Sequence, residues 1–72
     1  MPRLPVLTPR KLIKILTKLG FYVHHQTGSH INLRQREKEH LHVVIPYHGK
    51  DLAPKTLKSI LIQAELVNDD VL

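Results

Sequence analysis

The chain has 72 residues, a length that allows one domain built around one hydrophobic core. Eleven Lys and Arg against six Asp and Glu give a net charge of +5, which favours nucleic acid or an acidic protein as the partner. The absence of cysteine excludes a disulfide scaffold and a thiolate metal site, and the longest apolar run, residues 41–45, is far too short to span a bilayer. Because the N-terminal residues lack the apolar segment of a signal peptide, a soluble cytoplasmic protein is expected.

The proline-containing residues 1–7 are expected to form an extended N-terminal arm, followed by a single domain over residues 8–72. Thr8 and Pro9 predict a helix start, because Thr can cap the free amides and proline at the first helical position loses no needed donor. Apolar residues then recur at helical spacing until Gly20, which is typical of a helix end. These apolar residues are Leu12, Ile13, Leu16 and Leu19, and the opposite side carries Arg10, Lys11, Lys14 and Lys18.

After Gly20 the hydrophobic period changes to two, which predicts strands. A first strand alternates apolar Phe21 and Val23 with polar residues, and residues 26–28 turn the chain. Residues 29–34 are expected to return as a second strand, and a charged hairpin loop over residues 35–39 follows. A third strand is predicted over residues 40–45, with Leu41, Val43 and Ile45 facing the core.

Residues 46–51 are predicted to form a loop, since Pro46 cannot continue a strand ladder and Gly49 interrupts it. A second helix is expected to begin near Pro54, with a buried stripe of Leu57, Ile60, Leu61 and Ala64. The predicted order is α-β-β-β-α, an α+β fold in which a three-stranded antiparallel sheet carries both helices on one face.

This arrangement leaves the other face of the sheet uncovered, and its residues make it the candidate site. By alternation it carries Tyr22, His24, His30, Asn32, Arg34, His40 and His42. His24, His40 and His42 could assist chemistry, or they could be solvated strand residues. With no cysteine and no acidic residue on this face, we expect neither a metal site nor a cofactor.

Gly28, Ser29 and His30 lie where the turn passes into the second strand, and they carry the strongest chemical signal. Gly28 can adopt the positive φ of a tight turn and leaves the backbone open to a phosphate. His30 then stands on a basic surface, where an imidazole can act as acid or base near neutral pH. Which of these roles it takes is left open, as is the alternative that it is only a surface histidine.

Other basic residues are candidates for holding the phosphates of a nucleic acid. Arg34 lies on the same predicted face as His30, and His48 follows in the loop before the second helix. Lys55 and Lys58 belong to the first turns of that helix, near the positive end of its dipole. For His48 a structural hydrogen bond within the loop, and for each lysine ordinary solvation, are the alternatives.

Four segments, residues 19–21, 28–30, 44–48 and 56–61, resemble in order and spacing the HicA toxins of bacterial type II toxin–antitoxin systems. The resemblance extends over roughly residues 8–72 and implies a fold like that of double-stranded-RNA-binding domains. It also implies ribosome-independent mRNA cleavage, with His30 as the catalytic residue, and neutralisation by a HicB antitoxin. Glu65 stands where many members have glycine, and the proline-containing arm is unusual.

Three functions are therefore weighed. The first is a metal-independent endoribonuclease toxin that cleaves mRNA. The second is a non-catalytic RNA-binding module of the same fold, and the third is an adaptor that binds only a protein partner. His30 placed after Gly28 and Ser29 favours the first, since a simple RNA binder has no need of it.

Overall fold

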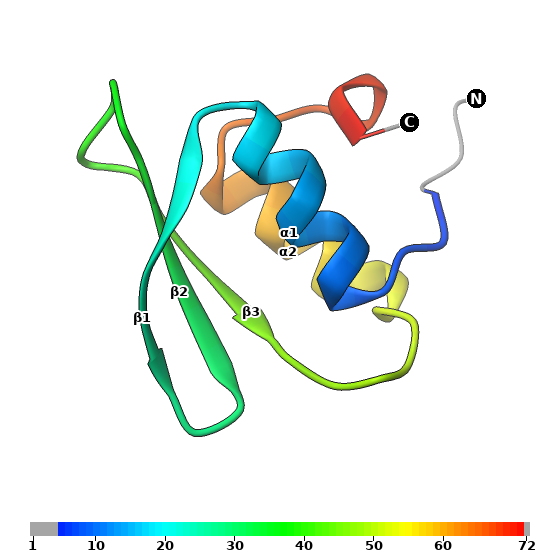
Figure 1. The fold of residues 1–72 in the computed structure, drawn as a ribbon. Coiled ribbons are helices and arrows are strands. Elements are labelled where there is room, and N and C mark those ends of the chain that lie inside the picture. The colour runs from blue at the N-terminus through cyan, green and yellow to red at the C-terminus, as the bar shows by residue number, and fades with distance from the viewer. Residues whose placement is uncertain (1–4, 72) are drawn as a thin grey trace.

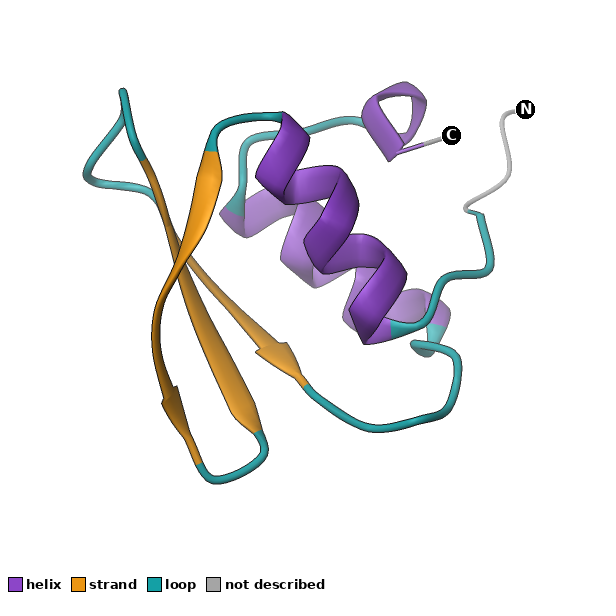
Figure 2. Cartoon of the chain, in the orientation of Figure 1, coloured by secondary structure: helices purple, strands orange, loops and turns teal. Residues whose placement is uncertain are grey.

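The computed structural model describes residues 5–71, and its chain order is α-β-β-β-α followed by a short 3-10 helix. The elements are α1 (Pro9–Lys18), β1 (Phe21–Thr27), β2 (His30–Gln35), β3 (His42–Pro46), α2 (Pro54–Gln63) and η1 (Asn68–Val71). The strands form one antiparallel sheet in the order β1-β2-β3, and both helices lie against the same face of it (Figures 1 and 2). The predicted fold is confirmed.

Helix α1 begins and ends where the sequence predicts. The Thr8 hydroxyl oxygen accepts a hydrogen bond from the Lys11 amide at 3.3 Å, and Pro9 occupies the first helical turn. Gly20 follows the helix with φ +95°, a conformation that a residue with a side chain rarely adopts. The capping residue and the glycine together fix the length of this helix.

The strand boundaries differ from the prediction at the first turn, at the end of β2 and at both ends of β3. Gln26 and Thr27 are not part of the turn, because they pair with Ile31 and His30 and extend β1. The turn therefore contains only Gly28 and Ser29, and the second strand begins at His30 rather than at Ser29.

Gln35, expected in the hairpin loop, pairs with Phe21 and ends β2. Pro46, expected in the next loop, ends β3, because it pairs with His30 at the end of the ladder although it has no amide hydrogen to donate. The third strand begins at His42 rather than at residue 40. There the Leu41 amide donates to the Lys38 carbonyl at 2.9 Å, which closes a turn and keeps residues 40 and 41 out of the sheet.

The core lies between the sheet and the two helices. Its most buried large side chains are Leu12, Leu16, Leu33, Ile45, Leu57 and Ile60. Residues 1–4 of the expected N-terminal arm lie outside the described residues. Leu7, at the end of that arm, is only 8% exposed, and its carbonyl accepts a hydrogen bond from the Leu52 amide at 2.8 Å. The chain thus enters the core before α1 begins.

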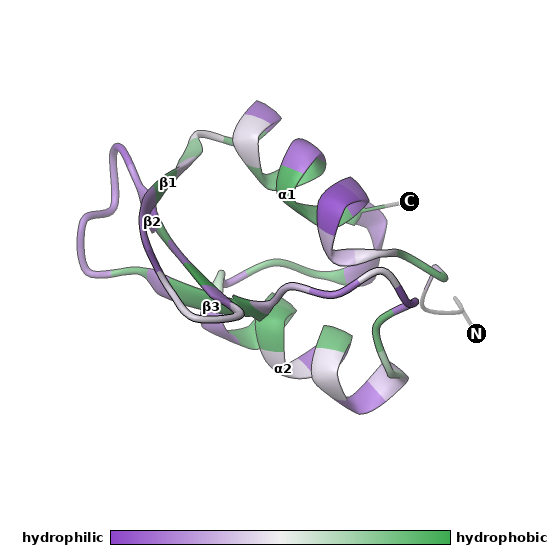
Figure 3. Ribbon diagram, turned by 60° about the horizontal axis from the view of Figure 1, so that its bottom comes forward, coloured by the Kyte–Doolittle hydropathy of each residue, from purple (hydrophilic) through white to green (hydrophobic). Residues whose placement is uncertain are grey.

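The connections gather at two opposite ends of the molecule. At one end lie the β1–β2 turn, the segment after β3 and the first turns of both helices; we call this the hairpin end. In Figure 1 the β1–β2 turn is at the bottom left, the two helix starts are at the lower right, and the segment after β3 runs between them. At the other end the hydrophilic loop between β2 and β3 projects away from the helices (Figure 3). Among the described residues, neither helix is long and apolar enough to cross a membrane.

Candidate nucleic-acid interface

Gly28 gives the β1–β2 turn its shape. Its φ is +57°, and no heavy atom outside its immediate neighbours lies within 4 Å of where a Cβ would stand. The Gln26 side-chain amide donates to the Gly28 carbonyl at 3.0 Å and steadies the turn. Glycine is therefore needed here for its conformation, as predicted, and the space above it is open to a ligand.

His30 is the first residue of β2, and its exposed side chain follows directly on this turn. Its backbone pairs with Thr27 on one side and Pro46 on the other, so a central strand fixes its position. Within residues 5–71, the histidines whose side chains make hydrogen bonds or ion pairs are His24, His25, His40, His42 and His48. The imidazole of His30 is thus left unengaged on a rigid support.

The sheet face away from the helices is arranged differently from the predicted set at two positions. A β-bulge between Val23 and His25 inserts His24, so His25 rather than His24 becomes the partner of Asn32. The ring nitrogens Nδ1 of His24 and His25 lie 2.8 Å apart. His40 is not on this face, because it precedes β3 and its Nε2 lies 3.5 Å from Glu65 Oε2, beyond α2.

Asn32 lies in the middle of this face and is only 8% exposed, the one buried polar residue among those described. Its Oδ1 lies 2.9 Å from His42 Nε2, so the His42 ring donates and the amide oxygen accepts. A buried polar group without such a partner would cost about 1–3 kcal/mol. The role of His42 is therefore to satisfy Asn32, which sequence alternation alone did not reveal.

Arg34 lies two residues after Asn32 on the same face of β2. In the sheet it pairs with Tyr22 on β1 and with His42 on β3. It is half-buried, and its Nε is a buried donor without a hydrogen-bond partner. The cation over the Tyr22 ring is Arg36 and not Arg34, since the guanidinium carbon of Arg36 lies 5.2 Å from the centroid of the Tyr22 ring. Arg34 thus adds positive charge to this face while part of its hydrogen-bonding capacity is unused.

The segment after β3 is tied to the β1–β2 turn, because the Tyr47 amide donates to the Ser29 carbonyl at 2.6 Å. His48 Nδ1 accepts from the Lys50 amide at 3.2 Å, which leaves Nε2 as the protonated nitrogen of the neutral ring. An open cleft of about 370 Å³ separates this segment from the start of α1. It is lined by Thr8, Arg10, Tyr47, His48 and Gly49.

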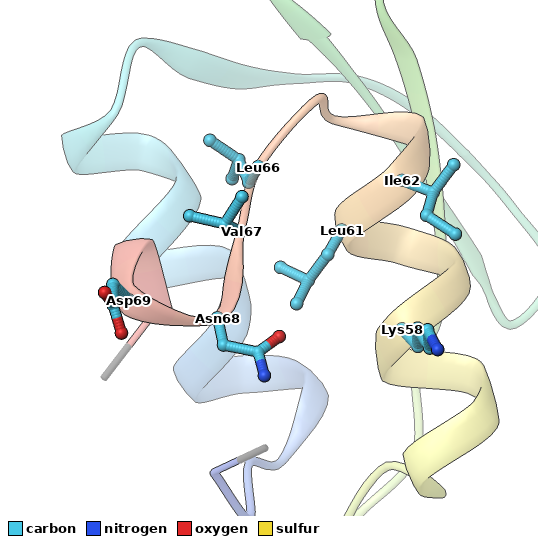
Figure 4. Close-up of a pocket in the computed structure, with 7 residues that line it drawn as sticks. All are labelled: Lys58, Leu61, Ile62, Leu66, Val67, Asn68 and Asp69. Atoms are coloured by element: carbon cyan, nitrogen blue, oxygen red, sulfur yellow. The ribbon is translucent and has the colours of Figure 1, made fainter. Parts of the chain in front are cut away.

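Helix α2 begins at the same end with free amides. Ala53 at its N-cap makes no side-chain hydrogen bond, and the first turn contains no acidic residue. Lys55 is exposed in this first turn, whereas Lys58, one turn later, lines a groove between α2 and the segment after it. Figure 4 shows Lys58 beside Ile62 on this helix. The structure therefore brings Lys55, Ser29, His30 and His48 to the hairpin end and places Lys58 on a flank of α2.

The charges are separated between the two ends. Five of the six acidic residues lie at the end away from the turn, in the β2–β3 loop or after α2: Glu37, Glu39, Glu65, Asp69 and Asp70. Asp51 is the sixth. Arg10, Lys11, Lys50 and Lys55 lie at the hairpin end together with two helix N-termini. Such an end attracts anions, because each helix N-terminus adds about half a positive charge.

Within residues 5–71, no group of three or more His, Asp or Glu side chains is placed to hold a metal ion. Arg10, Tyr47 and His25 were not among the predicted site residues. The exposed aromatic between Pro46 and His48 was the available signal for Tyr47, whereas the alternation pattern carries no sign of a bulge. The arrangement offers an imidazole, an aromatic ring and several cations at one end, which suits a nucleic-acid strand.

Comparison with known proteins identifies the family of the chain. None of the curated proteins compared with the chain matches it. A family model described as the HicA toxin of bacterial toxin–antitoxin matches residues 9–66, well over half of the chain. The matched residues include Gly28, His30 and His48. The chain therefore belongs to the HicA family of toxins of bacterial toxin–antitoxin systems.

Proposed function

We propose that this toxin is an endoribonuclease that cleaves mRNA in the cytoplasm, with His30 as its catalytic residue and without a metal ion. The observation that carries the proposal is the exposed, unengaged imidazole of His30 beside the open Gly28 turn, at the basic end of the molecule. Exposure gives the ring access to substrate, and the strand ladder on both sides holds it in place.

RNA can be cleaved through its own 2′-hydroxyl. A base takes the proton from this hydroxyl, the oxygen attacks the adjacent phosphorus, and the 5′-oxygen leaves with a proton from an acid. His30 performs one of the two proton transfers, each of which contributes about 10² to 10⁴ in rate. Positive charge stabilises the phosphorane, and the Nε2–H of His48 is a donor for one of its oxygens.

The RNA backbone is held by residues on both sides of His30. Gly28 and Ser29 offer backbone that a phosphate can approach, since the turn is exposed. Arg34, Lys55 and Lys58 supply cations, and His48 supplies its Nε2–H as a donor. Lys55 acts together with the uncapped amides of α2. Phosphate contacts of this kind give affinity and salt dependence rather than a choice of base sequence.

The test is RNA cleavage by purified His30→Ala protein. We expect cleavage to be lost while the fold and most of the RNA affinity remain, because His30 is exposed and contributes no packing. His40→Ala is the matched control, since that histidine is also exposed but pairs with Glu65 at the other end, and it should cleave as the parent does. Full cleavage by a folded His30→Ala protein would falsify the assignment.

A second arm tests the chemistry. A 2′-deoxy sugar at the scissile nucleotide should block cleavage, because it removes the nucleophile, whereas EDTA should have no effect. Loss of activity with EDTA and its recovery with a divalent ion would replace this scheme by a metal-dependent one. Loss of cleavage in both His30→Ala and His40→Ala would point to a general defect of the protein instead.

We further propose that a HicB-like antitoxin neutralises the toxin by covering the hairpin end. Membership of a toxin–antitoxin family implies a protein antagonist. The concentration of positive charge at this end would steer an acidic partner to the surface that RNA uses. Antitoxin and RNA would then exclude each other.

A further inference from the structure

The cleft between α1 and the segment after β3 has the dimensions of a small-ligand site. Its volume is about 370 Å³. This lies at the lower end of the range of roughly 300–1,000 Å³ for small-molecule sites, so the space in the cleft matches one nucleotide-sized group. The cleft opens beside the candidate catalytic residue, because the Ser29–Tyr47 hydrogen bond and the His30–Pro46 pair join its wall to the turn.

Tyr47 offers this cleft an open aromatic ring. The chain has three Phe and Tyr residues, of which Phe21 is in the core and Tyr22 is partly covered by Arg36. Tyr47 is 43% exposed, and its backbone is held by Pro46 of β3 and by the 2.6 Å bond to Ser29. An exposed ring on a fixed backbone is the feature on which single-stranded RNA stacks its bases.

Two cationic or donor groups lie in the same cleft. Arg10 is exposed on the opposite wall, and the ion pairs within residues 5–71 are those of Lys38 and His40 with Glu65, so Arg10 has no carboxylate partner there. His48 contributes the Nε2–H left free by its bond to Lys50. A planar ring and two donors across one nucleotide-sized space match a base together with its phosphate.

We propose that this cleft is a single-nucleotide subsite, in which the Tyr47 ring stacks on an unpaired base and the Arg10 guanidinium binds the adjoining phosphate. The inference rests on the proposed function, since the nucleotide held here is one that flanks the bond cleaved at His30. A purine is preferred over a pyrimidine, because its larger face covers more of the ring. The subsite thus gives an otherwise lenient nuclease a modest choice of base next to the cleavage point.

The test measures binding, so that it does not depend on catalysis. His30→Ala protein is titrated with short single-stranded RNA in which one abasic nucleotide is moved through each position in turn. We expect one position at which loss of the base weakens binding about 5- to 150-fold, the range measured for base stacking. When Tyr47→Ala is added to the His30→Ala protein, loss of the base at this position should no longer weaken binding. When Tyr47→Phe is added instead, loss of the base should still weaken it.

Arg10→Gln tests the phosphate contact. It should weaken binding to intact and abasic RNA alike and reduce the slope of log affinity against log salt by about 0.7, the value for one phosphate of a single strand. Lys18→Gln is the matched control, because Lys18 lies at the far end of the same helix, and both readouts should stay at the parent values.

The stacking role would be overturned if the abasic nucleotide weakened binding equally, position by position, in the His30→Ala protein and in the folded protein that also carries Tyr47→Ala. An unchanged salt slope in Arg10→Gln would overturn the phosphate role. If His30→Ala still cleaves RNA, the catalytic assignment has failed, and the same titrations with 2′-O-methyl RNA decide the subsite by themselves.

Discussion

Gly28→Ala tests whether the turn before His30 is held by backbone conformation alone. At φ +57° an L-residue pays about 1–2 kcal/mol for the left-handed conformation. No protein atom lies within 4 Å of the added Cβ, so no steric clash adds to this cost. We expect the free energy of unfolding to fall by about 1–2 kcal/mol, which for a domain of this size lowers Tm by roughly 4–16 °C.

Two further variants isolate the cause in the same thermal and urea denaturation experiments. Gly28→Asn should cost less than Gly28→Ala, because asparagine tolerates this conformation. Gly49→Ala is the control, since Gly49 also has open space around it but no positive φ, and it should be neutral or stabilising by about 0.4–1 kcal/mol. Equal losses in all three variants, or no loss in Gly28→Ala, would refute the conformational argument.

The same variants separate the fold from RNA contact. A loss of 1–2 kcal/mol leaves most molecules of a typical small domain folded, so it cannot by itself abolish binding. If phosphate approaches the Gly28 backbone, both Gly28→Ala and Gly28→Asn should weaken RNA binding more than their unfolded fraction explains. RNA affinity equal to that of the parent in both would place the phosphate elsewhere.

Three other predictions follow from the described contacts. His42→Ala should lower the free energy of unfolding by about 1–3 kcal/mol in urea titrations, because it leaves the buried Asn32 side-chain oxygen without its partner, and an unchanged midpoint would show that this bond is not needed. Lys55→Glu and Lys58→Glu should weaken RNA binding across sequences and flatten its salt dependence; a slope equal to the parent's would remove α2 from the RNA path. A HicB-like antitoxin at 100 times its Kd should stabilise the toxin by about 2.7 kcal/mol in thermal denaturation, and a ternary complex with uncleaved RNA and exposed His30 would contradict mutual exclusion.

The features predicted correctly from the sequence depend on chemistry within a few residues. The Thr8 cap, the end of α1 at Gly20 and the left-handed Gly28 each follow from the local residue types. The two errors on the sheet face have different causes. The bulge at His24 depends on how β1 pairs with β2, which no local pattern reveals. The turn that removes His40 from the sheet is local, closed by a backbone bond from the Leu41 amide to the Lys38 carbonyl, and the alternation pattern extended the strand across it.

The cleft could not be read from the sequence for a related reason. Arg10 and Tyr47 are far apart in the chain, and they face one space only because α1 and the end of β3 meet at the hairpin end. Periodicity assigns each residue to a face of its own element, but it does not say which loops and helix ends meet. Candidate residues on connecting segments are therefore the ones that sequence reasoning misses most easily.

The topology itself favours the hairpin end as the place of the proposed RNA site. Helix α1 runs away from this end, and three antiparallel strands then bring the chain back to it before α2 begins. Because the number of strands between the helices is odd, both helices must start at the same end, and their positive dipole ends act together. The acidic residues, apart from Asp51, lie away from the two helix N-termini, so they do not cancel the positive field there. The basic side chains thus reinforce a field that the backbone already supplies, and His30 lies within it.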